Sequence, residues 1–410
     1  MLQSTLTSRA SGAAISKYLI PDLPSAEELL PYLRRIDAAR WYSNFGPLVC
    51  EFEERLVSLL SESDTLAEAD SICLCTLVSG HHAVEIGLWL AGMGPGKRVL
   101  VPAVTFAACP LAVQHTGAEA VLGDVDPLHW MLTPKTARAA AEHSQIDAVM
   151  PVAVYGVPVS AADWDEFTLE TGIPVVIDAA AALQTQQIPR HCLVAHSLHA
   201  TKPFGIGEGG VLACRDPDKI KRSKSYANFG MIDRVSHLNG ANAKMSEFHA
   251  AVGLAQLRRW ADIKARRLEL LNLYIRHLKS YREMAALHPR IETAVVSCLM
   301  LLLKEPVADS VLAKGSQAGV GFHRTYLPPL YRHPHFKNLT AVDIFGRSVP
   351  QHFSLADKAD RMTNSEQLRA QLVGVPFHPF MDEADVVDVV THLSAMARSV
   401  SVGPTMHCSV

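Results

Sequence analysis

The sequence has little that would tie it to a membrane, a nucleic acid or an oxidising compartment. Its longest strongly apolar run, VVSCLMLLL at 295–303, is about half as long as a membrane-spanning helix. The net charge is only −3, from 38 basic and 41 acidic residues, which gives no electrostatic case for nucleic acid or an anionic membrane. The eight cysteines form no CxxC pair, a pattern typical of buried thiols in a reducing cytoplasm rather than of a disulfide or zinc framework. We therefore expect a cytoplasmic protein without a metal site.

The 410 residues are too many for one ordinary core, so two domains are expected. The first twenty residues contain Arg9 and Lys17 but no acids, and no apolar signal core follows them, which favours a flexible arm over a targeting peptide. Residues 25–38 then read as a helix with Ser25 and Glu28 in a capping box, and residues 47–60 as a second helix.

Short β-branched runs then alternate with helical segments. The predicted strands are 72–78, 98–102, 118–124, 147–155, 174–178, 193–197 and 209–215. Strands that alternate with helices indicate βαβ units, so the fold class is α/β, with a mostly parallel sheet flanked by helices.

Beyond about residue 245 the pattern changes to that of a smaller C-terminal α+β domain. A long helix is predicted over 245–285, strands over 294–303 and 320–328, and helices over 307–318 and 382–397, while 332–365 looks like an irregular surface excursion. The predicted organisation is an N-terminal arm and helix (1–40), a large α/β domain (41–265), a small α+β domain (266–400) and a tail (401–410).

Residues suited to one chemistry gather at the predicted carboxyl ends of the strands, where open parallel sheets bind ligands. Asp178 ends one strand and Ser197 another, while Gly80 and His81 open the helix after 72–78. Lys202 follows Ser197 by five residues and precedes the glycine-rich GIGEGG. One crevice is thus expected to hold a lysine, a carboxylate and a helix N-terminus.

These groups match a phosphorylated aldehyde on a pyridine ring. A lysine amine condenses with an aldehyde, backbone N–H groups at 80–82 and the Ser197 hydroxyl suit a phosphate, and a carboxylate at 178 keeps a pyridine nitrogen protonated. Phe106 is placed to stack on the ring. Taken singly, each feature is as ordinary as a surface lysine, a helix cap or a flexible turn. GIGEGG precedes a strand and follows its lysine, so it fits neither a dinucleotide fingerprint nor a P-loop.

The ordered set of motifs resembles the pyridoxal-phosphate sugar aminotransferases of the DegT/StrS type, within the fold type I aminotransferase superfamily. The resemblance runs from 40–56 to 375–390, and its landmarks include LVSGHHAVEIGL from residue 77, VVIDAAAA from 175, SLHATKPFGIGEGG from 197 and NGANAKMSEFHAAVGLAQL from 239. It implies pyridoxal 5'-phosphate as cofactor.

The resemblance also implies a role for individual residues. Lys202 is the expected Schiff-base lysine and Asp178 the partner of the pyridinium nitrogen. The remaining implied contacts are Phe106 stacked on the ring, Ser197 with the backbone of Gly80, His81 and His82 around the phosphate, and Asn242 reaching the phosphate of the neighbouring subunit. A homodimer with shared sites follows.

Two positions depart from the family pattern. His81 stands where a threonine is usual, so one phosphate contact is either altered or supplied by imidazole. Ala181 replaces a glutamine or histidine that usually contacts the cofactor's ring hydroxyl, which weakens inferences about the usual nucleotide-sugar substrate. A lysine at 202, rather than the histidine of the related deoxysugar dehydratases, favours transamination.

The expected activity moves an amino group from an amino acid, glutamate in most relatives, to a keto acceptor, by resemblance a nucleotide-linked ketosugar. His323, Arg324 and Tyr326 are candidates for the acceptor pocket, or equally the polar face of an edge strand. The alternatives are an aminotransferase for a non-sugar ketone and a non-catalytic, cofactor-binding regulatory protein. A dehydrogenase is disfavoured because no G-x-G-x-x-G follows the first strand.

Overall fold

The structure is a computed structural model that describes residues 15–62, 64 and 71–401. Its central sheet runs in the order β13-β12-β3-β2-β4 and continues, through the bridges Val149–Val175 and Val152–Asp178, into β5-β6-β7-β1. The strands are β1 (Cys73–Leu77), β2 (Arg98–Pro102), β3 (Glu119–Gly123), β4 (Ala148–Val149), β5 (Val176–Asp178), β6 (Leu193–Ser197), β7 (Gly210–Cys214), β12 (Ala341–Val342) and β13 (Ser348–Val349). Strands β12, β3, β2 and β4 pair in parallel, as do β5 and β6, while β7 is antiparallel to both its neighbours. The predicted mostly parallel α/β fold is confirmed.

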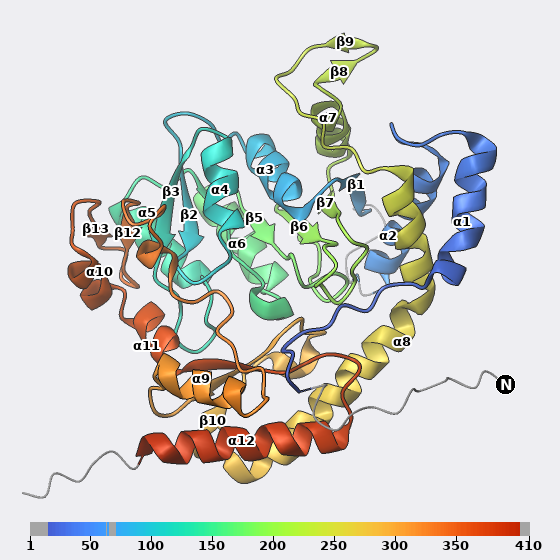
Figure 1. Ribbon diagram of the computed structural model, residues 1–410. Helices are drawn as coiled ribbons and strands as arrows, with labels where there is room; N and C mark the ends of the chain where they lie inside the picture. Colours follow the sequence, from blue (N-terminus) through green and yellow to red (C-terminus); the bar gives the residue numbers. More distant parts are fainter. Residues whose placement is uncertain (1–14, 63, 65–70, 402–410) are drawn as a thin grey trace, which may run out of the picture.

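Helices flank this sheet (Figure 1). They are α3 (Gly80–Leu90), α4 (Ala108–His115), α5 (Pro134–His143), α6 (Ala161–Thr171) and α7 (Pro217–Ala227). Two more, α1 (Ala26–Ala39) and α2 (Pro47–Ser61), pack on the first half of α8 (Glu247–Leu278). The capping box predicted from Ser25 and Glu28 is present. None of the helices in the described residues is long and apolar enough to cross a bilayer.

A second, antiparallel sheet lies in the C-terminal part. It contains β10 (Ala285–Ala286), β11 (Leu299–Leu303) and β14 (Leu372–Val375), with helices α9 (Asp309–Gln317) and α12 (Glu383–Ser401) nearby. The 32-residue α8 runs from α1 and α2 to α12, where its second half packs (Figure 1). A domain division at residue 265 stays a prediction.

Two predictions for the C-terminal part are wrong. Residues 320–328 form no strand: Tyr326 takes a positive φ of 65°, which turns the chain, and only His323 bridges to Gly374 of β14. Residues 332–365 are not a surface excursion, because β12 pairs in parallel with β3, and Val342 and Val349 are buried. This stretch also contains α10 (Leu355–Arg361) and leads into α11 (Thr363–Gln371).

Residues 15–20 are not a free arm either. The carbonyl of Ile15 accepts the N–H of Gly321 at 2.7 Å, and that of Tyr18 accepts the N–H of Phe377 at 3.0 Å. The Tyr18 ring lies 4.3 Å from that of His323. The predicted flexible arm is therefore wrong for this segment, while residues 1–14 of the arm and 402–410 of the tail lie outside the described residues.

Candidate active site

A cavity of about 550 Å³ lies at the carboxyl ends of β1, β2, β5 and β6, facing the C-terminal part of the chain. It brings together all the predicted site residues except His82 and Asn242. Those that line it are Gly80, His81, Phe106, Asp178, Ser197, Lys202, His323, Arg324 and Tyr326. This volume is in the range of about 300–1,000 Å³ typical of small-molecule sites.

The N-terminus of α3 is pressed against the end of β6. A Cβ added at Gly80 would lie 2.6 Å from Cβ of Ser197, and one at Gly210 would lie 2.2 Å from the carbonyl oxygen of Ser79. Glycine at 80 and 210 thus lets the first turn of α3 reach Ser197, which explains part of the glycine-rich run after Lys202. The first-turn N–H groups of Gly80 and His81 have no carbonyl one turn earlier to bind, and they suit an anion.

His82 plays a different part from the one expected. Its N–H donates to Oγ of Ser79, the N-cap of α3, at 3.3 Å, and its Nδ1 lies 2.9 Å from the same oxygen. The end of the cavity beside α3 therefore offers an anion the N–H groups of Gly80 and His81, together with the Ser197 hydroxyl.

Asp178 is 7% exposed and its two carboxylate oxygens are held separately. Oδ1 accepts the N–H of Ala180 at 2.9 Å, and Oδ2 accepts the thiol of Cys109 at 3.1 Å. Burial, followed by the charge of Asp178, raises the pKa of Cys109, so the thiol stays protonated and donates. The carboxylate is fixed in orientation at the cavity floor.

Lys202 lies in the loop between β6 and β7. The backbone N–H of Lys202 donates to the carbonyl of His199 at 2.9 Å. The N–H of Ala200 donates to the carbonyl of Gly207 at 2.8 Å, and Gly207 takes a positive φ of 99°. Burial raises the pKa of Cys298 in the cavity wall, while the charge of Lys202 acts in the opposite direction. Lys202 and Cys298 both line the cavity.

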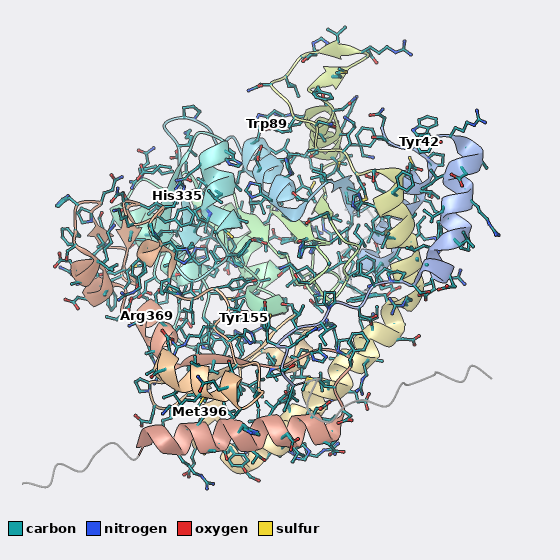
Figure 2. All side chains as sticks on the ribbon, in the orientation of Figure 1. Tyr42, Trp89, Tyr155, His335, Arg369 and Met396 are labelled. Carbon is teal, nitrogen blue, oxygen red and sulfur yellow. The ribbon has the colours of Figure 1, made fainter. Side chains whose placement is uncertain are left out.

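Tyr155 connects the sheet to the C-terminal wall of the cavity and sits near the centre of the molecule (Figure 2). Its hydroxyl donates to the carbonyl of Thr325 at 2.9 Å, and its carbonyl accepts the N–H of Ser297 at 2.9 Å. Its ring stacks on Tyr326 at 5.1 Å, and Tyr326 in turn lies 6.3 Å from Phe106. An aromatic wall therefore continues from the C-terminal part to the residue expected to cover a planar ring.

His323 and Arg324 are partly engaged within the wall itself. Burial lowers the pKa of His323 to about 4, so its imidazole is neutral. The Arg324 guanidinium donates to the carbonyl of Val307, and its Nε lies 3.3 Å from a carboxylate oxygen of Asp309. Both side chains reach the cavity, although no strand carries them.

Sequence reasoning missed several residues of the site. Thr105 lies in the loop after β2 and Cys109 in the first turn of α4, with Oγ1 of Thr105 3.3 Å from Sγ of Cys109. Their position directly after a predicted strand was a signal for the site. Cys298, Tyr155 and Tyr18 offered no such signal, because the contacts that bring them to the site are long-range.

Asn242 lies outside the cavity lining, where its Oδ1 accepts Nζ of Lys244 at 2.8 Å and its backbone bridges to Asn228. It adjoins the hairpin of β8 (Met231–Ile232) and β9 (Val235–Ser236), which projects from the body beyond α7 (Figure 1). Its place is therefore on an outward-facing segment of its own chain.

The site fits pyridoxal phosphate on its own chemistry. An oriented carboxylate and an amine share one cavity with a helix N-terminus that only glycine allows to approach Ser197. Together with the mostly parallel sheet, these features define the class of pyridoxal-phosphate aminotransferases of fold type I.

Residues 24–394 match the DegT/DnrJ/EryC1/StrS aminotransferase family, and the chain belongs to it. It is an aminotransferase whose cofactor is pyridoxal phosphate. Protein Rv3402c of Mycobacterium tuberculosis is 29% identical over 94% of this chain and 92% of its own. The UDP-2-acetamido-2-deoxy-3-oxo-D-glucuronate aminotransferase of Pseudomonas aeruginosa is 26% identical over 83% of this chain and 88% of its own. The crystal structure of DesI in the presence of its TDP-sugar product is 25% identical, with a TM-score of 0.79 over 95% of this chain and 96% of that one.

Proposed function

We propose that the enzyme transfers an amino group from glutamate to the keto group of a nucleotide-linked sugar, with Lys202 and Asp178 as its catalytic residues. The observation that carries the proposal is the shared cavity of Lys202 and Asp178, with Asp178 oriented by Ala180 and Cys109. The names of the Pseudomonas aminotransferase and of DesI, which is named with a TDP-sugar product, support the sugar acceptor.

The chain's own groups divide the work. Pyridoxal phosphate supplies an aldehyde and an electron-withdrawing ring. Asp178 holds the proton of the ring nitrogen, and the N–H groups of Gly80 and His81 with the Ser197 hydroxyl bind the phosphate. Nζ of Lys202 removes the proton from the α-carbon of the amino donor and later returns one to the acceptor carbon, acting as general base and acid. Phe106 covers the ring face.

The assignment of Lys202 is tested by spectroscopy. Lys202→Ala is expected to abolish the visible absorbance of the lysine-bound cofactor and the bleaching that glutamate causes in the parent protein. Lys221→Ala, at an exposed lysine on α7, serves as the control and is expected to keep both signals. An unchanged spectrum for Lys202→Ala would refute the assignment.

The acceptor side of the proposal rests on His323, Arg324 and Tyr326 in the cavity wall, where a guanidinium suits a pyrophosphate or carboxylate. The amine form of the enzyme is to be mixed with nucleotide ketosugars and with small keto acids. An acceptor that takes the amino group is expected to restore the visible absorbance of the lysine-bound cofactor. If only non-sugar ketones restore this absorbance, a sugar acceptor is excluded.

A homodimer with shared sites completes the proposal. Exposed apolar side chains gather on and beside the β8–β9 hairpin, at Phe229, Met231, Ile232 and Val235, and Asn242 adjoins them without lining its own cavity. Co-expression of Lys202→Ala with Asn242→Ala chains is expected to restore activity that each variant lacks alone. No restoration from a confirmed mixed dimer would exclude a shared site.

A cytoplasmic location also belongs to the proposal, supported by free thiols at the seven described cysteines.

A further inference from the structure

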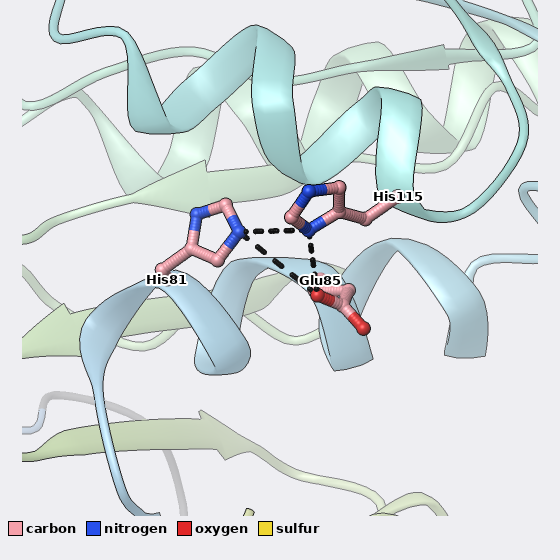
Figure 3. Close-up of side chains that lie close together, drawn as sticks. All are labelled: His81, Glu85 and His115. Carbon is pink, nitrogen blue, oxygen red and sulfur yellow. Dashed lines mark hydrogen bonds and ion pairs between the residues drawn. The ribbon is translucent and has the colours of Figure 1, made fainter. Parts of the chain in front are cut away.

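Two imidazoles and a carboxylate meet beside the phosphate end of the cavity (Figure 3). Nε2 of His81 lies 3.1 Å from Nδ1 of His115, and Oε2 of Glu85 lies 3.4 Å from the His115 nitrogen and 4.0 Å from the His81 nitrogen. His81 and Glu85 are one turn apart on α3, and His115 comes from the last turn of α4. Among the histidine, cysteine, aspartate and glutamate side chains of the described residues, these three form the one group that lies close enough together to hold a metal ion.

The three separations fit one small cation. Zn²⁺ binds imidazole nitrogens and carboxylate oxygens at about 2.0–2.2 Å in tetrahedral geometry, which places two ligand atoms roughly 3.3–3.6 Å apart. The observed 3.1, 3.4 and 4.0 Å bracket this range. Two nitrogens and one oxygen suit a transition metal better than Mg²⁺ or Ca²⁺, which prefer ligand sets made of oxygen atoms.

Neighbouring groups orient the ligands in the way that metal sites require. The hydroxyl of Tyr226 donates to Oε1 of Glu85 at 3.1 Å, which leaves Oε2 turned toward the histidines. Nε2 is the nitrogen of His81 that faces His115. Glu85 is largely buried, with 12% of its side chain exposed, whereas that of His115 is 55% exposed, so an ion has a path from solvent.

We propose that His81, Glu85 and His115 bind one Zn²⁺ ion, with a water molecule in the fourth position. Such an ion fixes α3 to α4 just behind the helix terminus at the cavity. It also gives the imidazole of His81 a role away from the phosphate, while its backbone N–H remains at the cavity. The cysteine pattern predicted no metal site, and His115 is too far from His81 in the sequence, 34 residues, to form a recognisable metal-binding motif.

The test uses the full-length, cofactor-loaded enzyme without a polyhistidine tag. After treatment with a chelator, the protein is titrated with Zn²⁺ in competition with a chromogenic chelator. The parent is expected to bind one equivalent per chain. His115→Gln and Glu85→Gln are each expected to weaken binding at least about tenfold. His143→Gln removes an exposed histidine in the last turn of α5 and is expected to bind as the parent does.

Location is tested separately by anomalous diffraction at the zinc absorption edge, where one peak between α3 and α4 is expected. The proposal is overturned if the parent does not bind Zn²⁺ stoichiometrically, if His115→Gln binds Zn²⁺ as tightly as the parent, or if the anomalous peak lies elsewhere. In that case His81 and His115 are joined only by a hydrogen bond between their rings. His115 and Glu85 do not line the cavity. The cofactor spectrum of their variants therefore reports independently on the proposed aminotransferase site.

Discussion

The thiol of Cys109 donates to Oδ2 of Asp178 at 3.1 Å, inside a core where Cys109 has no exposed surface. This contact ties the first turn of α4 to the end of β5, and it leaves the direction of the Asp178 carboxylate fixed from two sides. If Asp178 holds the ring proton of the cofactor, Cys109 is a positioning residue for that function.

Cys109→Ala should therefore weaken cofactor binding while the fold remains intact. A single hydrogen bond is worth about 0.5–1.5 kcal/mol, which corresponds to a roughly 2- to 13-fold rise in the dissociation constant of pyridoxal phosphate. Cys109→Ser is the matched variant, because its hydroxyl donates in the same place, and it should recover most of the loss. The measurement is a cofactor titration followed by absorbance, and equal affinities for the alanine variant and the parent would contradict the role.

Gly80→Ala should disrupt the phosphate end of the cavity. The new Cβ would stand 2.6 Å from Cβ of Ser197 and 2.9 Å from its Cα, so α3 or β6 must shift. Gly94→Ala is the control, since its nearest neighbour would be 3.8 Å away. We expect Gly80→Ala to lose at least about tenfold in phosphate affinity, or about 1.4 kcal/mol, in a titration with inorganic phosphate. Parent-like binding by Gly80→Ala would mean that the cradle lies elsewhere.

Acid should destabilise the protein through His288. Its Nε2–H donates to the carbonyl of His129 at 2.8 Å and its Nδ1 accepts the N–H of Arg290 at 3.1 Å, an arrangement that only the neutral ring can make. Burial lowers its pKa to about 4 from 6.5, so the unfolded chain binds the extra proton first as the pH falls. The contribution of neutral His288 to the free energy of unfolding is fully present above pH 6.5 and declines toward pH 4. At pH 5 it has fallen by about 2 kcal/mol.

The measurement for His288 is urea unfolding at pH 7 and pH 5. His288→Gln, whose amide does not titrate, should lose less stability between the two pH values than the parent does. The buried His196 and His323, whose pKa values are also lowered to about 4 by burial, remain in both proteins and cancel in the comparison. Equal losses in both proteins would exclude His288 as a contributor.

Glu247→Gln should weaken the junction of α2 with α8. The carboxylate of Glu247 is 1% exposed and accepts the N–H groups of Leu48 at 2.8 Å and Val49 at 3.0 Å, at the positive end of α2. Replacing this charge should lower the free energy of unfolding by about 1–3 kcal/mol. Glu54→Gln, on the exposed face of the same helix, should change it by less than about 0.5 kcal/mol. Equal effects from the two changes would refute a capping role for Glu247.

The sequence was most informative where a continuous apolar run meets a chain breaker. Strands 98–102 and 193–197 were predicted with their observed bounds, because each is a short and mostly apolar run, and both are largely buried. The run 147–155 was too long, since Tyr155 takes a positive φ and leads the chain out of the sheet. The two-residue β12 has no periodicity to detect, and its pairing with β3 depends on contacts more than two hundred residues apart.

The candidate site shows the same contrast. Asp178, Ser197 and Lys202 were found because strand ends mark the ligand edge of a parallel sheet. Cys109, Tyr155 and Tyr18 were missed, because their partners at the site, Asp178, Thr325 and His323, come from distant segments. Residues 320–328 were predicted as a strand, whereas the backbone turns at Tyr326 and leaves the side chains of His323, Arg324 and Tyr326 in a cavity wall.

Strand β12 lies more than two hundred residues after its partner β3 in the sequence, and this order affects the folding of the chain during synthesis. Until residues 341–342 leave the ribosome, the outer edge of β3 presents unpaired N–H and C=O groups to other nascent chains. A polypeptide of the first 265 residues lacks β12 and β13, so any β3 strand that it forms keeps this edge unpaired. This truncated product is expected to self-associate, and a short peptide that contains β12 and β13 (residues 341–349) is expected to prevent the association.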